Sequence, residues 1–353
     1  MKNKILLFAM SVILVVSLAV LGCAAPGPTP EKPVEISMMH YMPATHNVQT
    51  NMFEPWTKML EENTGGRVKV TTYPAAALAK PADFYDATIA GIVDIAQSYS
   101  GYTPGRFPVS DVCGLPFLGA NSAKAASLAF MDMYNKFPEM SDEWKEVKVL
   151  FFVTHPPMQL FTTEVPVRTF DDLKGLKIKI SGRPAPYLEA LGATPISMAS
   201  PEVYDALDKG VIDGCIYPWT EVYGAWKLDE LCKYYTALNF YTMPWVIGMN
   251  WAKWDSLPKD IQKEIEKLSG SYGTEMFANA WDAEDIAFYN QLKGDADREL
   301  ILLSAAEVDR GRQLEKPFYD EWAADATAKG ADGQKILDDM IEFSETYSAK
   351  YPK

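Results

Sequence analysis

The sequence predicts an α/β protein of two lobes, with a ligand cleft between the lobes and a helical C-terminal region. Strand-like and helix-like segments alternate over residues 34–96, and the same alternation starts again at residue 147. Beyond residue 250 the pattern is mainly helical. Strand–helix–strand order favours parallel sheets with right-handed crossovers. Two such units joined by crossing strands leave a cleft, which is where open α/β sheets place their ligands.

The first run of elements begins with an alternating apolar segment and continues with apolar residues at helical spacing. Gly65-Gly66 ends the first helix, because glycine readily adopts the left-handed conformation that follows a helix. The patterns predict strands over 34–39, 68–73 and 92–96, and helices over 48–62 and 83–90.

The second run repeats this order and then becomes helical. Ser200 is expected to cap a helix whose first residue is a proline. Val211-Ile212 leads into Asp213-Gly214, where a further turn is expected. The patterns predict strands over 147–153, 159–163 and 176–180, and helices over 184–191, 201–209, 259–282 and 306–347.

The N-terminus predicts export. A short basic segment precedes an apolar stretch over residues 5–20, which suits a signal peptide and is short for a membrane-spanning helix. Gly22-Cys23 at its end resembles a bacterial lipobox, and the resemblance implies a signal peptide over 1–22 and a lipid on Cys23. The alternative is an ordinary signal peptide in which Cys23 is incidental. Four prolines in 23–33 predict a semi-extended tether.

Composition excludes several classes of partner. Removing 22 of the 353 residues leaves 331, enough for two lobes, and no later segment is long and apolar enough to span a membrane. Loss of Lys2 and Lys4 takes the formal charge from −14 to −16. We therefore expect no nucleic-acid partner and no membrane contact except through the anchor.

Three further cysteines leave at least one unpaired thiol, with a Cys215–Cys232 bridge left open.

Several segments together resemble one family of proteins. They are GRVKVTTYPA at 66–75, GYTPGRFPVSDVCGLPFL at 101–118, DLKGLKI at 172–178, LGATP at 191–195, EVY at 202–204, GVIDG at 210–214 and MNWAKWDSLP at 249–258. In this order they resemble the solute-binding proteins of tripartite ATP-independent periplasmic (TRAP) transporters, of the dicarboxylate-receptor (DctP) type. The resemblance covers nearly the whole mature chain.

The resemblance implies a periplasmic-binding-protein-like fold and a function without chemistry. The chain would capture a small organic anion, such as an aromatic or 2-oxo carboxylate, and deliver it to the small and large TRAP membrane subunits. It would work outside the cytoplasmic membrane, held by its lipid, without a cofactor. Together with the two strand–helix runs, the resemblance implies a first lobe of 34–156 plus 243–282. The second lobe would take 157–242 plus 283–353, with C-terminal helices packing across both.

The resemblance also implies an arginine that grips the ligand carboxylate at the end of the 176–180 strand, and this position holds Lys179. Alternation along the strand points Lys179 away from the face that carries Ile178 and Ile180. Lysine offers a point charge in place of the planar fork of arginine. Arg183 follows four residues later, beside a predicted helix N-terminus. Either Arg183 holds the ligand, or Lys179 does so alone.

Aromatic and polar residues beside these motifs are candidates for the remaining walls of the site. Each aromatic residue alone has a simpler interpretation as part of the core, whereas the set predicts a pocket with an apolar portion. The three scattered histidines do not form a metal site, so we expect no metal. The candidates are His40, Tyr41, His46, Tyr99, Tyr102, His155, Gln159, Tyr217, Trp219, Tyr241 and Trp245.

Two other functions compete with transport. An exported hydrolase is disfavoured, because the sequence has no Gly-x-Ser-x-Gly elbow, no His-Glu-x-x-His, no Cys-x-x-Cys and no P-loop. A binding protein that serves a sensor would carry the same domain. The sequence does not separate sensing from transport.

Overall fold

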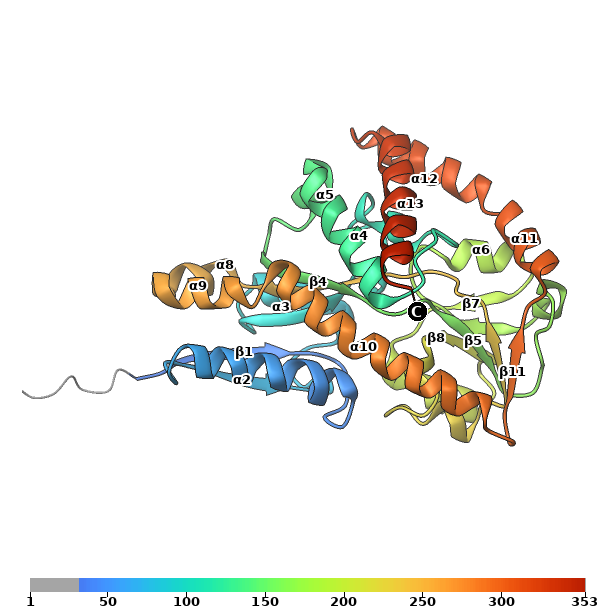
Figure 1. Ribbon diagram of the computed structural model, residues 1–353, viewed down its shortest axis with the longest axis horizontal. Helices are drawn as coiled ribbons and strands as arrows, with labels where there is room; N and C mark the ends of the chain where they lie inside the picture. The colour runs from blue at the N-terminus through green and yellow to red at the C-terminus, as the bar shows by residue number, and fades with distance from the viewer. Residues whose placement is uncertain (1–31, 353) are drawn as a thin grey trace, which may run out of the picture.

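The computed structural model describes residues 32–352. Two β-sheets, each covered by helices, form two lobes that lie side by side (Figure 1). The predicted two-lobed α/β fold is therefore confirmed. The predicted signal peptide, Cys23 and nearly all of the tether lie outside the described residues. No helix within the described range is long and apolar enough to cross a membrane.

The first sheet has five strands in the order β2-β1-β3-β10-β4. β1 runs parallel to β2 and β3, whereas β10 is antiparallel to both of its neighbours. β10 therefore arrives from the other lobe and enters the middle of the sheet. The strands are β1 (Val34–Met39), β2 (Val68–Tyr73), β3 (Ile95–Tyr99), β4 (Lys148–Thr154) and β10 (Pro244–Met249).

The second sheet has six strands in the order β11-β9-β5-β8-β6-β7. β6 lies parallel to β7 and β8, and β5 is antiparallel to β8 and β9. The chain crosses between the sheets from β4 to β5 and returns from β9 to β10. The strands are β5 (Gln159–Thr162), β6 (Lys177–Lys179), β7 (Thr194–Ile196), β8 (Gly214–Tyr217), β9 (Tyr234–Ala237) and β11 (Glu299–Leu302).

Helices pack on both sheets, and the helix expected over 48–62 is a π-helix, η1 (Val48–Phe53), continued by α2 (Glu54–Asn63). The other helices of the first half are α3 (Phe84–Ile89), α4 (Ala123–Lys136), α5 (Pro138–Glu143), α6 (Ala185–Ala190) and α7 (Val203–Asp208). Those of the second half are α8 (Trp251–Ser256), α9 (Lys259–Lys267), α10 (Gly270–Lys293), α11 (Ala305–Gln313), α12 (Lys316–Ala328) and α13 (Gly333–Lys350).

Three sequence-based boundaries are wrong. The helix expected over 259–282 is two helices, because α9 ends at Lys267 and α10 begins at Gly270. The third strand begins at Ile95 and not at residue 92, because Gly91 takes a positive φ of 71° in a turn that leaves Ile92 61% exposed. The single helix expected over 306–347 is three helices. Pro317 begins a new helix within its first turn, and Gly330 at φ 94° turns the chain before α13.

The long helix α10 spans both lobes (Figure 1). Its first half packs on β4 and α4 of the first lobe, and its second half reaches β11 of the second. Trp281 in the middle of α10 stacks on Trp245 of β10, with ring centroids 4.3 Å apart and planes 6° from parallel. One rigid helix thus supports the floor of the space between the sheets.

The C-terminal helices divide between the lobes, which differs from the sequence-based expectation that residues 283–353 belong to the second lobe. α11 packs on that lobe, where the Tyr187 hydroxyl donates to the Gly311 carbonyl at 2.7 Å. α12 and α13 return to the first lobe. The Trp322 indole donates to the Pro108 carbonyl at 3.0 Å, and the Tyr347 hydroxyl donates to Asp132 at 2.6 Å.

Gly333, at the start of α13, allows that helix to approach α12. A Cβ atom here would lie 2.1 Å from the Ala323 carbonyl oxygen, a backbone atom that cannot move by itself. We expect Gly333→Ala to lower the free energy of unfolding by about 1–3 kcal/mol, measured by denaturant titration. Gly294→Ala is the matched control, because its Cβ would meet only the Gln291 carbonyl at 3.6 Å. Equal stability of the two variants would contradict this packing.

Candidate functional site

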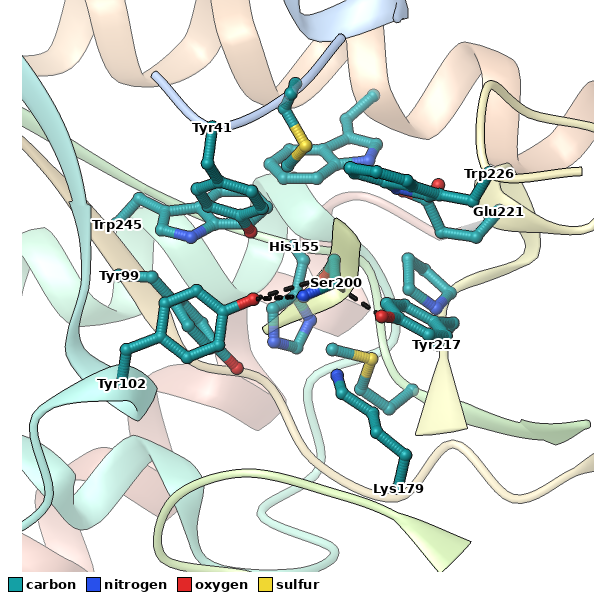
Figure 2. Close-up of a pocket in the computed structure, with 14 residues that line it drawn as sticks. Tyr41, Tyr99, Tyr102, His155, Lys179, Ser200, Tyr217, Glu221, Trp226 and Trp245 are labelled. Carbon is teal, nitrogen blue, oxygen red and sulfur yellow. Dashed lines mark hydrogen bonds between the residues drawn. The ribbon is translucent and has the colours of Figure 1, made fainter. Parts of the chain in front are cut away.

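A cavity lies between the two lobes (Figure 2). Aromatic rings form most of its wall, and nearly all the residues around it are buried, so the lobes are closed over it. The first lobe contributes Tyr41, Met42, Tyr99, Tyr102, His155, Trp245 and Trp281; the second contributes Met158, Lys179, Ser200, Tyr217, Pro218, Glu221 and Trp226.

Lys179 ends β6 and points into this cavity (Figure 2). The preceding Ile178 lies in the core, so the alternation of the strand delivers the lysine to the open face. The residue is only 4% exposed, and its Nζ lies 4.2 Å from the centroid of the Tyr217 ring. No ion pair to a described residue holds it. Burial lowers the pKa of Lys179 to about 8, with Cys215 and Glu221 acting in the opposite direction.

Hydrogen bonds join the lobes across one side of the cavity. The Tyr102 hydroxyl of the first lobe lies 3.1 Å from Ser200 Oγ of the second and accepts from the Ser200 N–H at 3.1 Å. The Tyr217 hydroxyl donates to the same Ser200 Oγ at 2.9 Å. Ser200 therefore connects a tyrosine of each lobe.

A second polar contact joins the lobes through His46 and Glu221. The His46 Nε2 atom lies 3.3 Å from each carboxylate oxygen of Glu221, and both side chains are buried. His46 Nδ1 accepts from the Val48 N–H at 3.2 Å, which leaves the ring proton on Nε2 to be donated to Glu221. His46 does not itself line the cavity, whereas Glu221 does.

His155 is a neutral part of the wall. Its Nδ1 donates to the Pro156 carbonyl at 2.8 Å, and its Nε2 accepts from the Met243 N–H at 3.1 Å. Burial lowers its pKa to about 3, and the nearby charge of Lys179 acts in the same direction. The Nε2 contact thus ties together the two segments that cross between the sheets, while the Nδ1 contact with the neighbouring Pro156 fixes the ring.

One donor in the wall has no partner among the described residues. The Trp245 indole nitrogen is buried and makes no hydrogen bond to residues 32–352. A buried donor without a partner costs free energy, so a bound solute that accepts from it gains affinity. Tyr99 packs against the Trp245 ring at a centroid distance of 5.5 Å and holds it in place.

Six of the predicted site residues lie outside the lining of the cavity, and His46, described above, is one of them. Arg183 follows a turn at Gly182, where φ is 82°, and its guanidinium lies 3.9 Å from the Asp325 carboxylate in a separate surface hollow. This turn carries Arg183 away from Lys179. The other four are Gln159, His40, Trp219 and Tyr241.

These four side chains support the walls. The Gln159 amide nitrogen donates to the Pro157 carbonyl at 2.8 Å, and its oxygen accepts from the Leu238 N–H at 2.8 Å. His40 stacks on Phe53 at 5.1 Å and bonds to Gln49, and burial lowers its pKa to about 4. Trp219 stacks on Phe161, and Tyr241 meets the His155 ring edge-on at 5.7 Å.

Seven of the residues predicted from the sequence line the cavity: Lys179, Tyr217 and five residues of the first lobe. The other residues of the lining were not predicted from the sequence. Ser200 was expected only as a helix cap, and Glu221 was not singled out. A lone carboxylate inside the largely apolar segment 214–226 was the available signal for Glu221. The remaining residues that were missed are Met42, Met158, Pro218, Trp226 and Trp281.

The described residues contain no group of three or more His, Cys, Asp and Glu side chains that could hold a metal ion. Cys113, Cys215 and Cys232 are all buried free thiols, so the structure has no Cys215–Cys232 bridge. The arrangement around the cavity offers one buried cation, several hydrogen-bond donors and aromatic surface. Such a site suits the binding of a small anion with an apolar body.

Residues 38–325 match the family described as bacterial extracellular solute-binding protein, family 7. The chain belongs to this family. Its members are solute-binding receptors that work with TRAP transporter membrane subunits, and they act in the periplasm. The predicted TRAP resemblance is therefore confirmed.

Solved structures of TRAP solute-binding proteins resemble this fold closely. A protein from Rhodoferax ferrireducens, in complex with copurified benzoate, is 30% identical, has a TM-score of 0.84, and is matched over 90% of this chain and 99% of its own. A Bordetella bronchiseptica protein with bound mandelate is 32% identical and has a TM-score of 0.83. The match covers 89% of this chain and 99% of that protein. The C4-dicarboxylate-binding periplasmic protein DctP of Rhodobacter capsulatus is 26% identical, over 86% of this chain and 90% of its own.

The burial of Lys179 predicts an unusual titration. Because desolvation disfavours the ammonium, we expect its signal in carbon-13 NMR of labelled lysine to titrate near pH 8, well below exposed lysines. The group is charged below that pH and neutral above it, so an anion should bind best below pH 8. Lys179→Arg should remove this signal and thereby assign it. A midpoint at or above pH 10 would contradict the buried environment.

Proposed function

We propose that the cavity binds a monocarboxylate with an aromatic body and that Lys179 holds its charged end. The observation that carries this proposal is the unpaired, buried ammonium of Lys179. Of the described residues that line the cavity, it alone is cationic. A buried charge without a partner is costly, and a carboxylate in contact with it would offset that cost.

The walls support an aromatic body for the ligand. Tyr41, Trp245 and Trp281 form one continuous set of rings, in which Tyr41 meets Trp245 edge-on at 6.4 Å. Aromatic surfaces favour a flat ring through offset or edge-on contacts. The rings of these three residues line the cavity together, so a flat ring bound there would contact aromatic surface.

Relatives of similar sequence support the same class of ligand. The Rhodoferax ferrireducens protein was found with benzoate and the Bordetella bronchiseptica protein with mandelate. A marine metagenome protein described as specific for aromatic acid ligands is 31% identical, with a TM-score of 0.84 over 92% of this chain and 100% of its own. Its bound ligand is 3-hydroxybenzoate.

The contacts between the lobes give the receptor its two states. Ser200 and Glu221 of the second lobe are hydrogen-bonded to Tyr102 and His46 of the first, and these bonds must break when the lobes open. A ligand that touches both lobes favours the closed state by the difference in its affinity for the two states. The closed receptor would then be the form that the TRAP membrane subunits recognise. No chemical step is part of this proposal.

Substitution of the two candidate cations tests the proposal. We expect Lys179→Met to weaken benzoate binding by about tenfold to a hundredfold, because a hydrogen bond to a charged group contributes about 1.5–3 kcal/mol. Arg183→Met should leave the affinity within about twofold, because Arg183 lies beside Asp325 outside the cavity. Isothermal titration calorimetry measures both. The opposite order of effects would assign the ligand to Arg183 and overturn the proposal.

We further propose that the mature chain is anchored by a lipid on Cys23, which the lipobox-like segment supports. Several acyl chains on one residue would hold a protein stably at a membrane, which a single chain does not. The proline-rich tether would then let the binding domain stand away from the surface.

Cys23→Ala tests the anchor. We expect the parent protein in the membrane fraction of expressing cells and the variant in the soluble extracytoplasmic fraction, as seen by immunoblot. Mass spectrometry of the parent should show an acylated N-terminal cysteine. Cys113→Ala is the control, because this buried thiol has no role in anchoring. If parent and Cys23→Ala are equally soluble, the lipid proposal is wrong.

A further inference from the structure

A carboxylate in the wall of the cavity is not explained by a ligand that carries only an anion. Glu221 lies at the end of a short 3-10 turn (Trp219–Glu221) and is 3% exposed. Figure 2 places it on a different side of the cavity from Lys179, with Tyr217 between them. No ion pair joins Glu221 to Lys179. We propose that Glu221 accepts a hydrogen bond from a hydroxyl group at the end of the ligand remote from its carboxylate.

This inference rests on the proposed function and narrows it to hydroxylated aromatic acids. An ionised carboxylate has two oxygens that together accept about four hydrogen bonds. In the described part of the chain, the donor to these oxygens is His46 Nε2, which is shared between them at 3.3 Å each. No lysine or arginine of residues 32–352 forms an ion pair with Glu221. The carboxylate therefore keeps acceptor capacity on the side where it lines the cavity.

A buried carboxylate with few donors is costly, and a ligand can supply what is missing. Burial without hydrogen bonds disfavours a charged group strongly. A ligand hydroxyl that donates to Glu221 would satisfy one of its oxygens, whereas an unsubstituted ring would leave it facing apolar surface. The site would thus bind a ligand without the hydroxyl more weakly. The reason is that leaving a buried polar group unpaired costs more free energy than a hydrogen bond contributes.

A hydroxyl fits this position better than an ammonium. A hydroxyl needs one acceptor, whereas an ammonium needs three. Trp226, the ring beside Glu221 in Figure 2, offers an indole donor and no acceptor. The Tyr217 hydroxyl is already donated to Ser200. Glu221 is therefore the acceptor that this side of the cavity provides.

The experiment compares benzoate with its three monohydroxy isomers by isothermal titration calorimetry at pH 7, on the mature chain. We expect at least one isomer to bind the parent about tenfold or more tightly than benzoate, as a charge-assisted hydrogen bond allows. In Glu221→Met, which removes the acceptor at similar volume, this advantage should fall below about threefold. Glu221→Gln keeps one acceptor oxygen without the charge, so it should retain an intermediate advantage and serves if the methionine variant does not fold.

Two controls separate direct contact from other effects. Glu284 carries a second carboxylate near Glu221 without lining the cavity, and burial together with Glu221 raises its pKa to about 7. Glu284→Gln should leave the preference for the hydroxylated isomer unchanged. Lys179→Met should weaken all four acids alike, because it acts on the carboxylate that they share.

The outcomes are distinct. If benzoate binds but no ring hydroxyl improves its affinity, the inference is wrong while the aromatic-acid function stands. Equal weakening of all four acids by Glu221→Met would show that Glu221 only joins the lobes through His46, and would also overturn the inference. If 3-(aminomethyl)benzoate binds more tightly than every hydroxy isomer, Glu221 recognises a cationic group and not a hydroxyl, and the inference is wrong. If none of the acids binds, the proposed function fails together with the inference.

Discussion

The buried and unpaired charge of Lys179 is the constraint on which the site depends. A lysine at the end of a short strand, covered by the opposite lobe, loses much of its hydration, and its lowered pKa is the consequence. No described residue of the cavity wall forms an ion pair with the Lys179 ammonium. What surrounds it instead is aromatic surface, with the Tyr217 ring beneath the ammonium. Such a ring attracts a cation weakly enough to leave it available for an anionic solute.

The two lobes around Lys179 are joined firmly on one side of the cavity and only by a few hydrogen bonds on the other. Crossing segments tied by His155, together with the helix α10, fix the two sheets at the floor of the cavity. At its rim the lobes meet through Ser200 with Tyr102 and through Glu221 with His46. These few bonds can be exchanged for water when the lobes part, whereas the packed floor cannot. Motion is therefore expected about the crossing segments.

The periodicity of the sequence predicted strands, helices and the direction of side chains along a strand, but it did not predict contacts between distant segments. Alternation along 176–180 correctly turned Lys179 away from the core, and the two strand–helix runs predicted both sheets. Arg183 could not be placed, because the positive φ at Gly182 decides its direction and no neighbouring pattern reveals it. Glu221 lines a cavity whose other wall comes from the distant first lobe, and its hydrogen-bond partner His46 lies 175 residues away in the sequence. No local pattern encodes such a contact, so the second polar group of the cavity stayed hidden.

The return of the last two helices to the first lobe has a consequence for synthesis. That lobe is assembled from three stretches of chain. The third arrives only with α12 and α13, of which α13 packs on α4 and α12 packs on α13. Its core therefore stays incomplete until α13 has left the ribosome. Contacts between residues as distant as Asp132 and Tyr347 form slowly, since a long loop must close first. A nascent chain delayed in this way remains unfolded and threadable, the condition in which a polypeptide crosses a membrane through a narrow channel.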